Sequence, residues 1–274
     1  MSAKVAVIES VLARVLASLA VVVPAIAAAG PSGKDLLAKQ EEARKIRAFQ
    51  ASATLTTTKA GESGQAKKFT WWRKLGSDGV HFVTLIRFKE PATIRGEGLL
   101  VREGDDDNDV KLYLPRFKKI RRVEGQSQRS SFFGSVFSYS DIAIPHARDY
   151  SAEVKREEPC PGEASNVTCY VVEITPATET ERTRTGYGRS LQWVRGDVWI
   201  TVKAELYDLK NKLWKKLEAK SVREIDKASH KWIAHELRIE DVPANRVTVL
   251  TLGDVRANAK IEDTVFTDQN LSSE

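Results

Sequence analysis

The fold is decided by an alternating stretch near the start of the chain, Ala51-Ser52-Ala53-Thr54-Leu55-Thr56-Thr57. Small or apolar residues alternate there with polar ones, which is the period-two pattern of a strand with one buried face. Residues 32–46, just before it, have helical spacing instead, because Ser32 can cap a helix and apolar residues recur on one face from Leu36 to Ile46. The sequence therefore predicts one amphipathic helix followed by strands.

Strand patterns continue from this stretch to the end of the chain. They cover residues 69–72, 80–88, 99–101, 110–114, 167–174, 191–194, 198–206, 212–219, 232–239 and 246–252, with Ile120 and Val123 beyond the fifth strand. Short turn sequences such as Ser77-Asp78-Gly79 separate most of them. The class is thus mainly β, an antiparallel meander of about eleven strands.

A sheet of that many strands must curl. If it closed on its own side chains it would be a packed barrel. If it curled with a gap, it would enclose an apolar concavity that a helix has to cover. The amino-terminal helix and the short segment 139–142 are the covers that the sequence offers.

Residues 1–29 have the order of a cleavable export signal. Lys4 and Arg14 precede an uncharged apolar stretch, Pro24 interrupts it, and small residues follow, so that cleavage is expected after Ala27 or Ala29. The stretch is short for a membrane span. We therefore expect export to the periplasm and a single mature domain over residues 30–274, which suits one β-rich unit.

Composition excludes several classes of protein. The 274 residues are 42% hydrophobic, with 43 Lys and Arg against 37 Asp and Glu, a net charge of +6. That is too apolar for a disordered chain and too weakly basic to identify a polyanionic partner. The two cysteines, Cys160 and Cys169, flank a turn-forming sequence, and export favours a disulfide between them over two buried thiols.

No enzyme signature is present, and we expect no catalytic residues, metal or cofactor. The glycine pairs around Glu97 and Tyr187 lack the third glycine of a dinucleotide loop, and Ser135 lacks the flanking glycines of a nucleophile elbow. The basic run of residues 116–122 raises the question of nucleic acid, but export argues against it. Its residues form a solvated strand face or a rim for anionic headgroups or an acidic partner, namely Arg116, Lys118, Arg121 and Arg122.

Three blocks of residues carry a family resemblance. They are Pro91-Ala92-Thr93-Ile94-Arg95-Gly96-Glu97-Gly98-Leu99-Leu100, then Leu112-Tyr113-Leu114-Pro115 with Ile120-Arg121-Arg122, and Ser131-Phe132-Phe133-Gly134-Ser135-Val136-Phe137-Ser138-Tyr139-Ser140-Asp141. This succession resembles the bacterial outer membrane lipoprotein-sorting proteins, the LolA-like relatives of the carriers LolA and LolB. Lys111 departs from the pattern, which has an apolar or aromatic residue there, and the cysteine pair has no counterpart in it.

The resemblance implies an open, incomplete β-barrel with helices in its mouth and a cavity for acyl chains. It also implies a monomeric periplasmic carrier of lipids or lipoproteins, working beside an inner-membrane transporter of the resistance-nodulation-division (RND/MMPL) type or an outer-membrane acceptor. The candidate cavity residues, five on strands and three on a covering loop, are Trp71, Phe82, Ile86, Leu112 and Leu114, with Phe132, Phe137 and Tyr139. Two alternatives remain open, a non-catalytic envelope interaction module with a filled barrel and an enzyme whose site has no recognisable motif.

Overall fold

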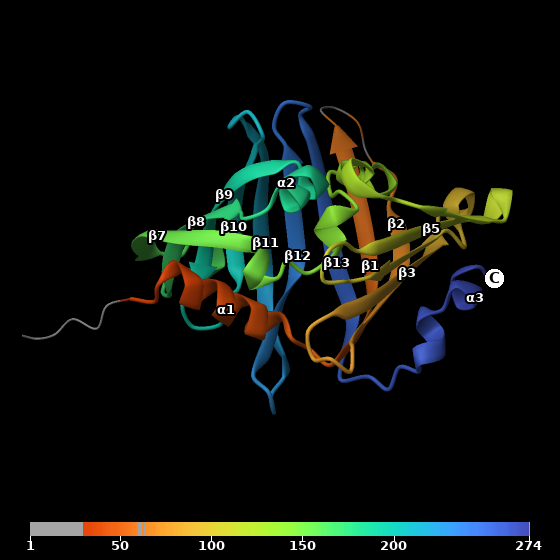
Figure 1. Ribbon diagram of the computed structural model, residues 1–274, viewed down its shortest axis with the longest axis horizontal. Helices are drawn as coiled ribbons and strands as arrows, with labels where there is room; N and C mark the ends of the chain where they lie inside the picture. Colours follow the sequence, from red (N-terminus) through yellow and green to blue (C-terminus); the bar gives the residue numbers. More distant parts are fainter. Residues whose placement is uncertain (1–29, 60–61, 63, 274) are drawn as a thin grey trace, which may run out of the picture. The chain divides into compact units, whose positions relative to one another are not determined.

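The computed structural model describes residues 30–59, 62 and 64–273, and the expected export signal lies outside these residues. In the described part, thirteen strands form one antiparallel sheet (Figure 1). The strands are β1 (Ala48–Lys59), β2 (Lys67–Leu75), β3 (Phe82–Glu90), β4 (Gly98–Arg102), β5 (Asp109–Leu114), β6 (Lys119–Arg122), β7 (Tyr150–Pro159), β8 (Thr168–Pro176), β9 (Tyr187–Arg195), β10 (Thr201–Asp208), β11 (Leu213–Asp226), β12 (Lys231–Asp241) and β13 (Arg246–Ala257). The α-helices are α1 (Gly33–Arg44), α2 (Glu179–Thr185) and α3 (Asp268–Leu271).

The order of strands across the sheet leaves it open. It runs β6-β5-β4-β3-β2-β1-β13-β12-β11-β10-β9-β8-β7, so that two meanders are joined where β1 pairs with β13. Strands β6 and β7 follow one another in the chain but form opposite edges. In Figure 1, β7 and β5 lie on opposite sides of the view. The predicted antiparallel, incomplete barrel is confirmed.

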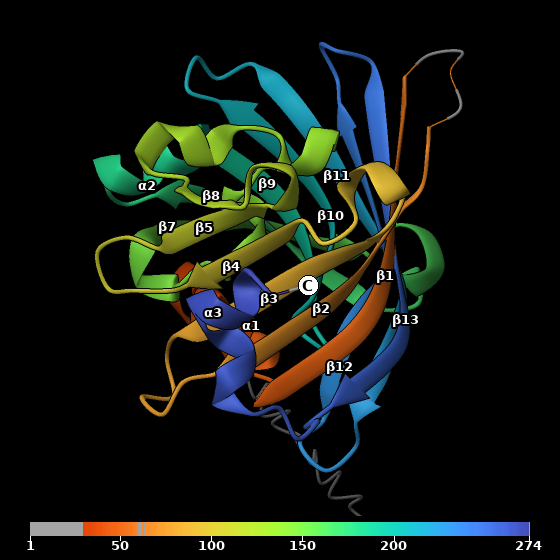
Figure 2. The ribbon, with the colours of Figure 1, turned by 90° about the vertical axis from the view of Figure 1, so that its right-hand side faces the viewer.

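Residues 123–149, which we call the crossing segment, connect the two edges. Short 3-10 turns break it up, and its apolar side chains pack onto the inner face of the sheet. Phe132, for example, is 1% exposed and contacts the rings of Phe69 and Phe88. Figure 2 shows the short turns of this segment, in yellow-green, beside α2 and above β5 in that view. One half of the barrel interior is therefore filled by the chain itself.

The carboxyl-terminal residues cover the outer face of the same half. Phe266 and Leu271 pack against Leu85 and Leu100, so β3 and β4 are buried on both sides. Asp268 anchors this segment, because its carboxylate accepts from Lys111 Nζ at 2.5 Å and Arg102 Nη2 at 2.9 Å. Lys111, which departs from the family pattern, therefore holds the chain end in place.

Helix α1 begins where the sequence predicts. The Ser32 hydroxyl accepts from the Asp35 N–H at 3.2 Å, and the Asp35 carboxylate accepts from the Ser32 N–H at 3.2 Å, a capping box. Leu36 and Leu37 pack against Val172 and Ile174. The helix thus lies on the inner face at the β8 side, across from the crossing segment (Figure 1).

Two strands differ from the sequence-based expectation, and both are edges. Tyr150–Pro159 carries charges at most positions and lacks a clear apolar alternation, because it is covered only in part and its charges discourage edge-to-edge pairing. The basic run is a tight turn through Lys118, at φ 48°, followed by the four exposed residues of β6. Residues 116–118 therefore do not belong to a strand, and only residues 119–122 of the run form a solvated strand.

The predicted disulfide between Cys160 and Cys169 is formed and buried. It joins the loop after β7 to strand β8 and lies against Val171, Trp193 and Val202. The sequence separation is 9, so the bond closes a short loop next to the edge strand. Closing this loop restricts the unfolded chain and holds β7 in register with β8.

We expect the double variant Cys160→Ala/Cys169→Ala to lose about 2–3 kcal/mol of unfolding free energy, the loop-entropy cost for a loop of this length. Urea unfolding followed by circular dichroism measures it. Reductant should lower the stability of the wild type and leave the double variant unchanged. A wild type and a double variant of equal stability would contradict this account.

Candidate functional site

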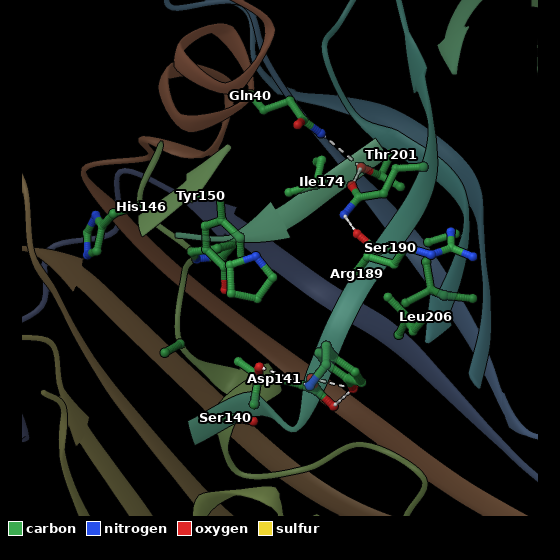
Figure 3. Close-up of a pocket in the computed structure, with 18 of the residues that line it drawn as sticks. Gln40, Ser140, Asp141, His146, Tyr150, Ile174, Arg189, Ser190, Thr201 and Leu206 are labelled. Atoms are coloured by element: carbon green, nitrogen blue, oxygen red, sulfur yellow. Dashed lines mark hydrogen bonds between the residues drawn. The ribbon is translucent and has the colours of Figure 1, made fainter. Parts of the chain in front are cut away.

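An apolar cleft lies on the inner face of the sheet, beside the half that the crossing segment fills. Its first lobe, of about 280 Å³, is bounded by α1, by β8 to β12 and by residues 137–147 of the crossing segment. Figure 3 shows Gln40 reaching into it from α1, with Asp141 at the opposite end and Leu206 on the wall. The apolar lining comprises Leu37, Phe137, Ile174, Ala204, Leu206, Leu217, Leu237 and Ile239.

The second lobe, of about 270 Å³, lies at the carboxyl end of α1. It is bounded by β1, β2 and β11 to β13, and three residues, Arg44, Thr201 and Leu237, line both lobes. Its lining is rich in aromatic and branched side chains, namely Phe49, Trp71, Trp199, Trp232, Ile233, Leu250 and Leu252. The two lobes together form one elongated apolar surface beneath α1, of the kind that ligand sites have.

A wider groove of about 650 Å³ lies between α1 and the start of β7. Charged side chains, among them Lys34, Glu41 and Arg148, contribute to its lining. Because an acyl chain gains free energy only by leaving water for apolar surroundings, this groove suits it less well than the two lobes.

Helix α1 covers the cleft through a small set of polar contacts. Gln40 Nε2 donates to Thr201 Oγ1 at 2.9 Å, and Glu41 Oε2 accepts from the Ala147 N–H at 2.7 Å. Gln40 is 1% exposed, yet its Oε1 accepts no hydrogen bond in the described part of the chain. An unmet buried acceptor is costly, so displacing the helix costs less free energy than it would if Gln40 were fully hydrogen-bonded.

A buried charged cluster closes the far end of the first lobe. Tyr187 Oη donates to Asp141 at 3.0 Å and accepts from Lys215 Nζ at 2.9 Å, while Lys215 lies 3.4 Å from the Asp141 carboxylate. Burial and the neighbouring Asp141 charge raise the pKa of Tyr187 well above its usual value. The phenol therefore stays protonated, and the cluster ties the crossing segment to β9 and β11.

A second ionic group lies along the side of the lobe. The Arg184 guanidinium donates to both oxygens of Glu181 at 2.7 and 2.6 Å, and Tyr150 Oη donates to the same carboxylate. Burial and the Glu181 charge raise the pKa of Tyr150 well above normal. These charges pair with one another, although Arg184 Nη1 has no hydrogen-bond partner among the described residues, and they fix α2 against the start of β7.

The eight candidate cavity residues do not gather in the cleft. Trp71 lines the second lobe and Phe137 the first. Ile86 and Phe132 are buried in the core beneath the crossing segment, and Leu112 and Tyr139 pack against that core. Phe82 is buried under the Arg73 guanidinium, and Leu114 is partly exposed at the end of β5.

The sequence reasoning missed the cleft residues of the carboxyl-terminal meander. Leu206, Leu217 and Leu237 lie on strands that were expected, but alternation alone does not tell which stretch of a face stays uncovered. The four rim residues lie together at the β5–β6 hairpin and are exposed, beside Phe117, which is 61% exposed.

Among the described residues there is neither a helix that could span a membrane nor a cluster of metal ligands. None of their helices has the length and apolar character needed to span a membrane. No group of three or more His, Cys, Asp or Glu residues in them is arranged to hold a metal ion.

Comparisons with known proteins agree with this architecture. A crystal structure of a DUF1329 family protein from Desulfovibrio piger has a TM-score of 0.80 at 28% identity, over 87% of this chain and 97% of that one. A putative outer membrane lipoprotein-sorting protein domain from Vibrio parahaemolyticus gives 0.79 at 20% identity, over 88% and 98%. A LolA superfamily protein from Nitrosomonas europaea gives 0.68 at 21% identity, over 88% and 99%. The fold is thus that of the LolA-like lipoprotein-sorting proteins, and the resemblance inferred from the motifs is confirmed.

A protein-family model described as "Uncharacterized protein" matches residues 83–273, and the chain belongs to this family. A search of the curated proteins finds no match.

We expect Asp141→Asn to cost about 3–5 kcal/mol of unfolding free energy, because it leaves the buried Lys215 ammonium without its counter-charge. Lys215→Met should cost less, because the Asp141 side chain is 17% exposed. The double variant should cost less than the sum of the two, by roughly 1–3 kcal/mol. Urea unfolding of all four proteins measures the coupling. Lys216→Met, on the exposed neighbour, is the control, and strictly additive losses would show that the cluster does not act as a unit.

Proposed function

We propose that this protein is an exported, non-catalytic carrier that binds the acyl chains of lipids or lipoproteins in the cleft beneath α1. The observation that supports it best is the elongated apolar surface formed by the two lobes, which is covered by a helix and not filled by side chains. The likeness to lipoprotein-sorting folds agrees with a carrier role.

The energetics of such a site favour reversible binding. Each methylene moved from water into the lobes gains about 0.8 kcal/mol, so a chain of ten or more carbons is held firmly. Release requires the cover to move. That movement breaks the hydrogen bonds of Gln40 and Glu41 and the bonds from Lys231 to Glu42, which water can replace, and it exposes Leu36 and Leu37. A partner that binds the open form would shift this equilibrium toward release.

The site of action is proposed to be the periplasm, between an inner-membrane transporter of the RND/MMPL type and an outer-membrane acceptor. The order of residues 1–29 supports export. The alternative is a non-catalytic interaction module of the envelope that works with a transporter of the RND type and carries no cargo.

The carrier proposal is tested with protein purified from periplasm without detergent. Native mass spectrometry should detect bound acyl species, and added decanoate should displace the neutral fluorescent probe phenylnaphthylamine. Leu237→Arg puts a charge at the junction of the lobes and should weaken probe binding by about tenfold or more. Leu209→Arg, on an exposed hairpin, is the matched control. Absence of both cargo and probe binding would favour the interaction module.

We further propose that the hairpin between β5 and β6 meets an anionic membrane surface. Arg116, Lys118, Arg121 and Arg122 are all exposed there, with Phe117 at the tip. Basic residues near such a surface contribute about 1 kcal/mol each, and an exposed aromatic side chain adds interfacial binding.

Vesicle co-sedimentation tests the hairpin. Wild type should pellet with phosphatidylglycerol vesicles and not with phosphatidylcholine vesicles, and raised salt should weaken the binding. Lys118→Glu/Arg121→Glu should reduce it by about tenfold or more, whereas Lys212→Glu/Lys227→Glu, at exposed sites elsewhere, should change it little. Equal losses in the two double variants would mean that net charge alone, and not this hairpin, directs binding.

A further inference from the structure

The second lobe contains two guanidinium groups among its apolar side chains. Arg44 comes from the last turn of α1 and Arg73 from the inner face of β2, and both line the lobe. Positive charge in an apolar recess is costly unless it is paired. The question is therefore what balances these two charges.

Neither guanidinium forms an ion pair with a carboxylate of the described residues. Arg73 donates only to neutral acceptors, Thr84 Oγ1 at 3.3 Å and the Ile142 carbonyl at 3.4 Å, and the Arg44 side chain donates no hydrogen bond within the same part of the chain. Burial lowers the pKa of Arg73 to about 10. The Glu103 charge opposes this shift, and the positive charge of Arg44 adds to it. Burial also lowers the pKa of Arg44.

The carboxylates whose charges act on these arginines are Glu103, near Arg73, and Glu41, near Arg44, and both already have other partners. Glu103 accepts from the backbone N–H groups of Phe82 at 2.9 Å and Ile144 at 2.8 Å. Glu41 accepts from the Ala147 N–H at 2.7 Å and lies 3.8 Å from Lys45. Both are committed to holding loops, so the arginine pair keeps unused capacity to bind an anion.

A third donor lies in the same lobe. The indole N–H of Trp71 is buried and donates to no acceptor in the described residues. The Arg73 guanidinium lies 5.0 Å from the centre of the Trp71 ring, so the two side chains are held against one another. An anionic oxygen is the acceptor that a buried N–H and two guanidinium groups have in common.

We infer that the Arg44–Arg73 end of the second lobe binds the anionic head group of an amphiphile, a carboxylate or a phosphate. The apolar chain then lies along Phe49, Leu250 and Leu252 or passes Leu237 into the first lobe. This inference rests on the proposed carrier function and adds the charge of the cargo to it. Because Arg44 lies on α1, head-group binding also draws the cover onto the cleft.

The experiment compares ligands of equal chain length by displacement of phenylnaphthylamine from the full mature protein. Decanoate should displace the probe at a concentration about tenfold or more below that of decan-1-ol, since charge-assisted hydrogen bonds add to the burial of the same chain. Inorganic phosphate alone should displace little. In Arg44→Gln/Arg73→Gln the preference for decanoate should fall below about twofold, and Arg44→Lys/Arg73→Lys should retain part of it.

Arg256→Gln, at an exposed position of β13, is the matched control and should keep the full preference. Circular dichroism checks that each variant folds. If Arg44→Gln/Arg73→Gln does not fold, the comparison is made with Arg44→Gln alone. That variant should fold, because the Arg44 side chain donates no hydrogen bond to the described residues. Equal displacement by decanoate and decan-1-ol in wild type would overturn the head-group inference and leave the carrier proposal standing.

If inorganic phosphate displaces the probe as well as decanoate does, the site binds a free anion, and the inference that it binds the head group of an amphiphile is overturned. Failure of every acyl compound to displace the probe would overturn the carrier proposal itself.

Discussion

The pairing of β1 with β13 is the interaction on which the rest of the structure depends. It joins two antiparallel meanders from opposite ends of the described chain, with Ala53 opposite Leu252 and Leu55 opposite Leu250. These apolar positions alternate with threonines, so one face of the seam is buried and the register is set by that face. Without this seam, neither the inner face nor the cleft that spans it would exist.

The open edges follow from the way the chain continues from β6 to β7. These strands are consecutive but stand at opposite ends of the sheet, and the crossing segment has to span the interior between them. The segment carries enough bulky side chains, Phe132 and Phe137 among them, to fill the half beside β2 to β5. The other half lies beneath α1, whose side chains do not fill the two lobes.

Much of the architecture could be predicted from the sequence because burial leaves a regular trace. The capped helix at Ser32, the alternation around Leu55 and the cysteine pair are local signals, and each has its expected structure. The edge strands could not be found this way. An edge strand pairs with a neighbour on one side only, and charged side chains discourage its pairing with another molecule. For this reason β6 and β7 lack the apolar alternation from which a strand is predicted.

The candidate site was harder to predict than the fold. The aromatic residues of the family block were expected to line a cavity, but most of the expected residues form the packed core beneath the crossing segment. A side chain that fills a core and one that borders a cleft have the same composition and the same alternation. The difference depends on distant segments, α1 and residues 123–149, which decide what part of the inner face is covered.

The central claim is that the unfilled space between α1 and the inner face is a binding cleft and not a packing defect. A crystal structure of protein purified from periplasm without detergent tests it most directly. The account predicts continuous extended density that follows Leu237 between the lobes, with its polar end at Arg44 and Arg73. A cleft closed by α1 and filled by its own side chains, with no density between them, would contradict it.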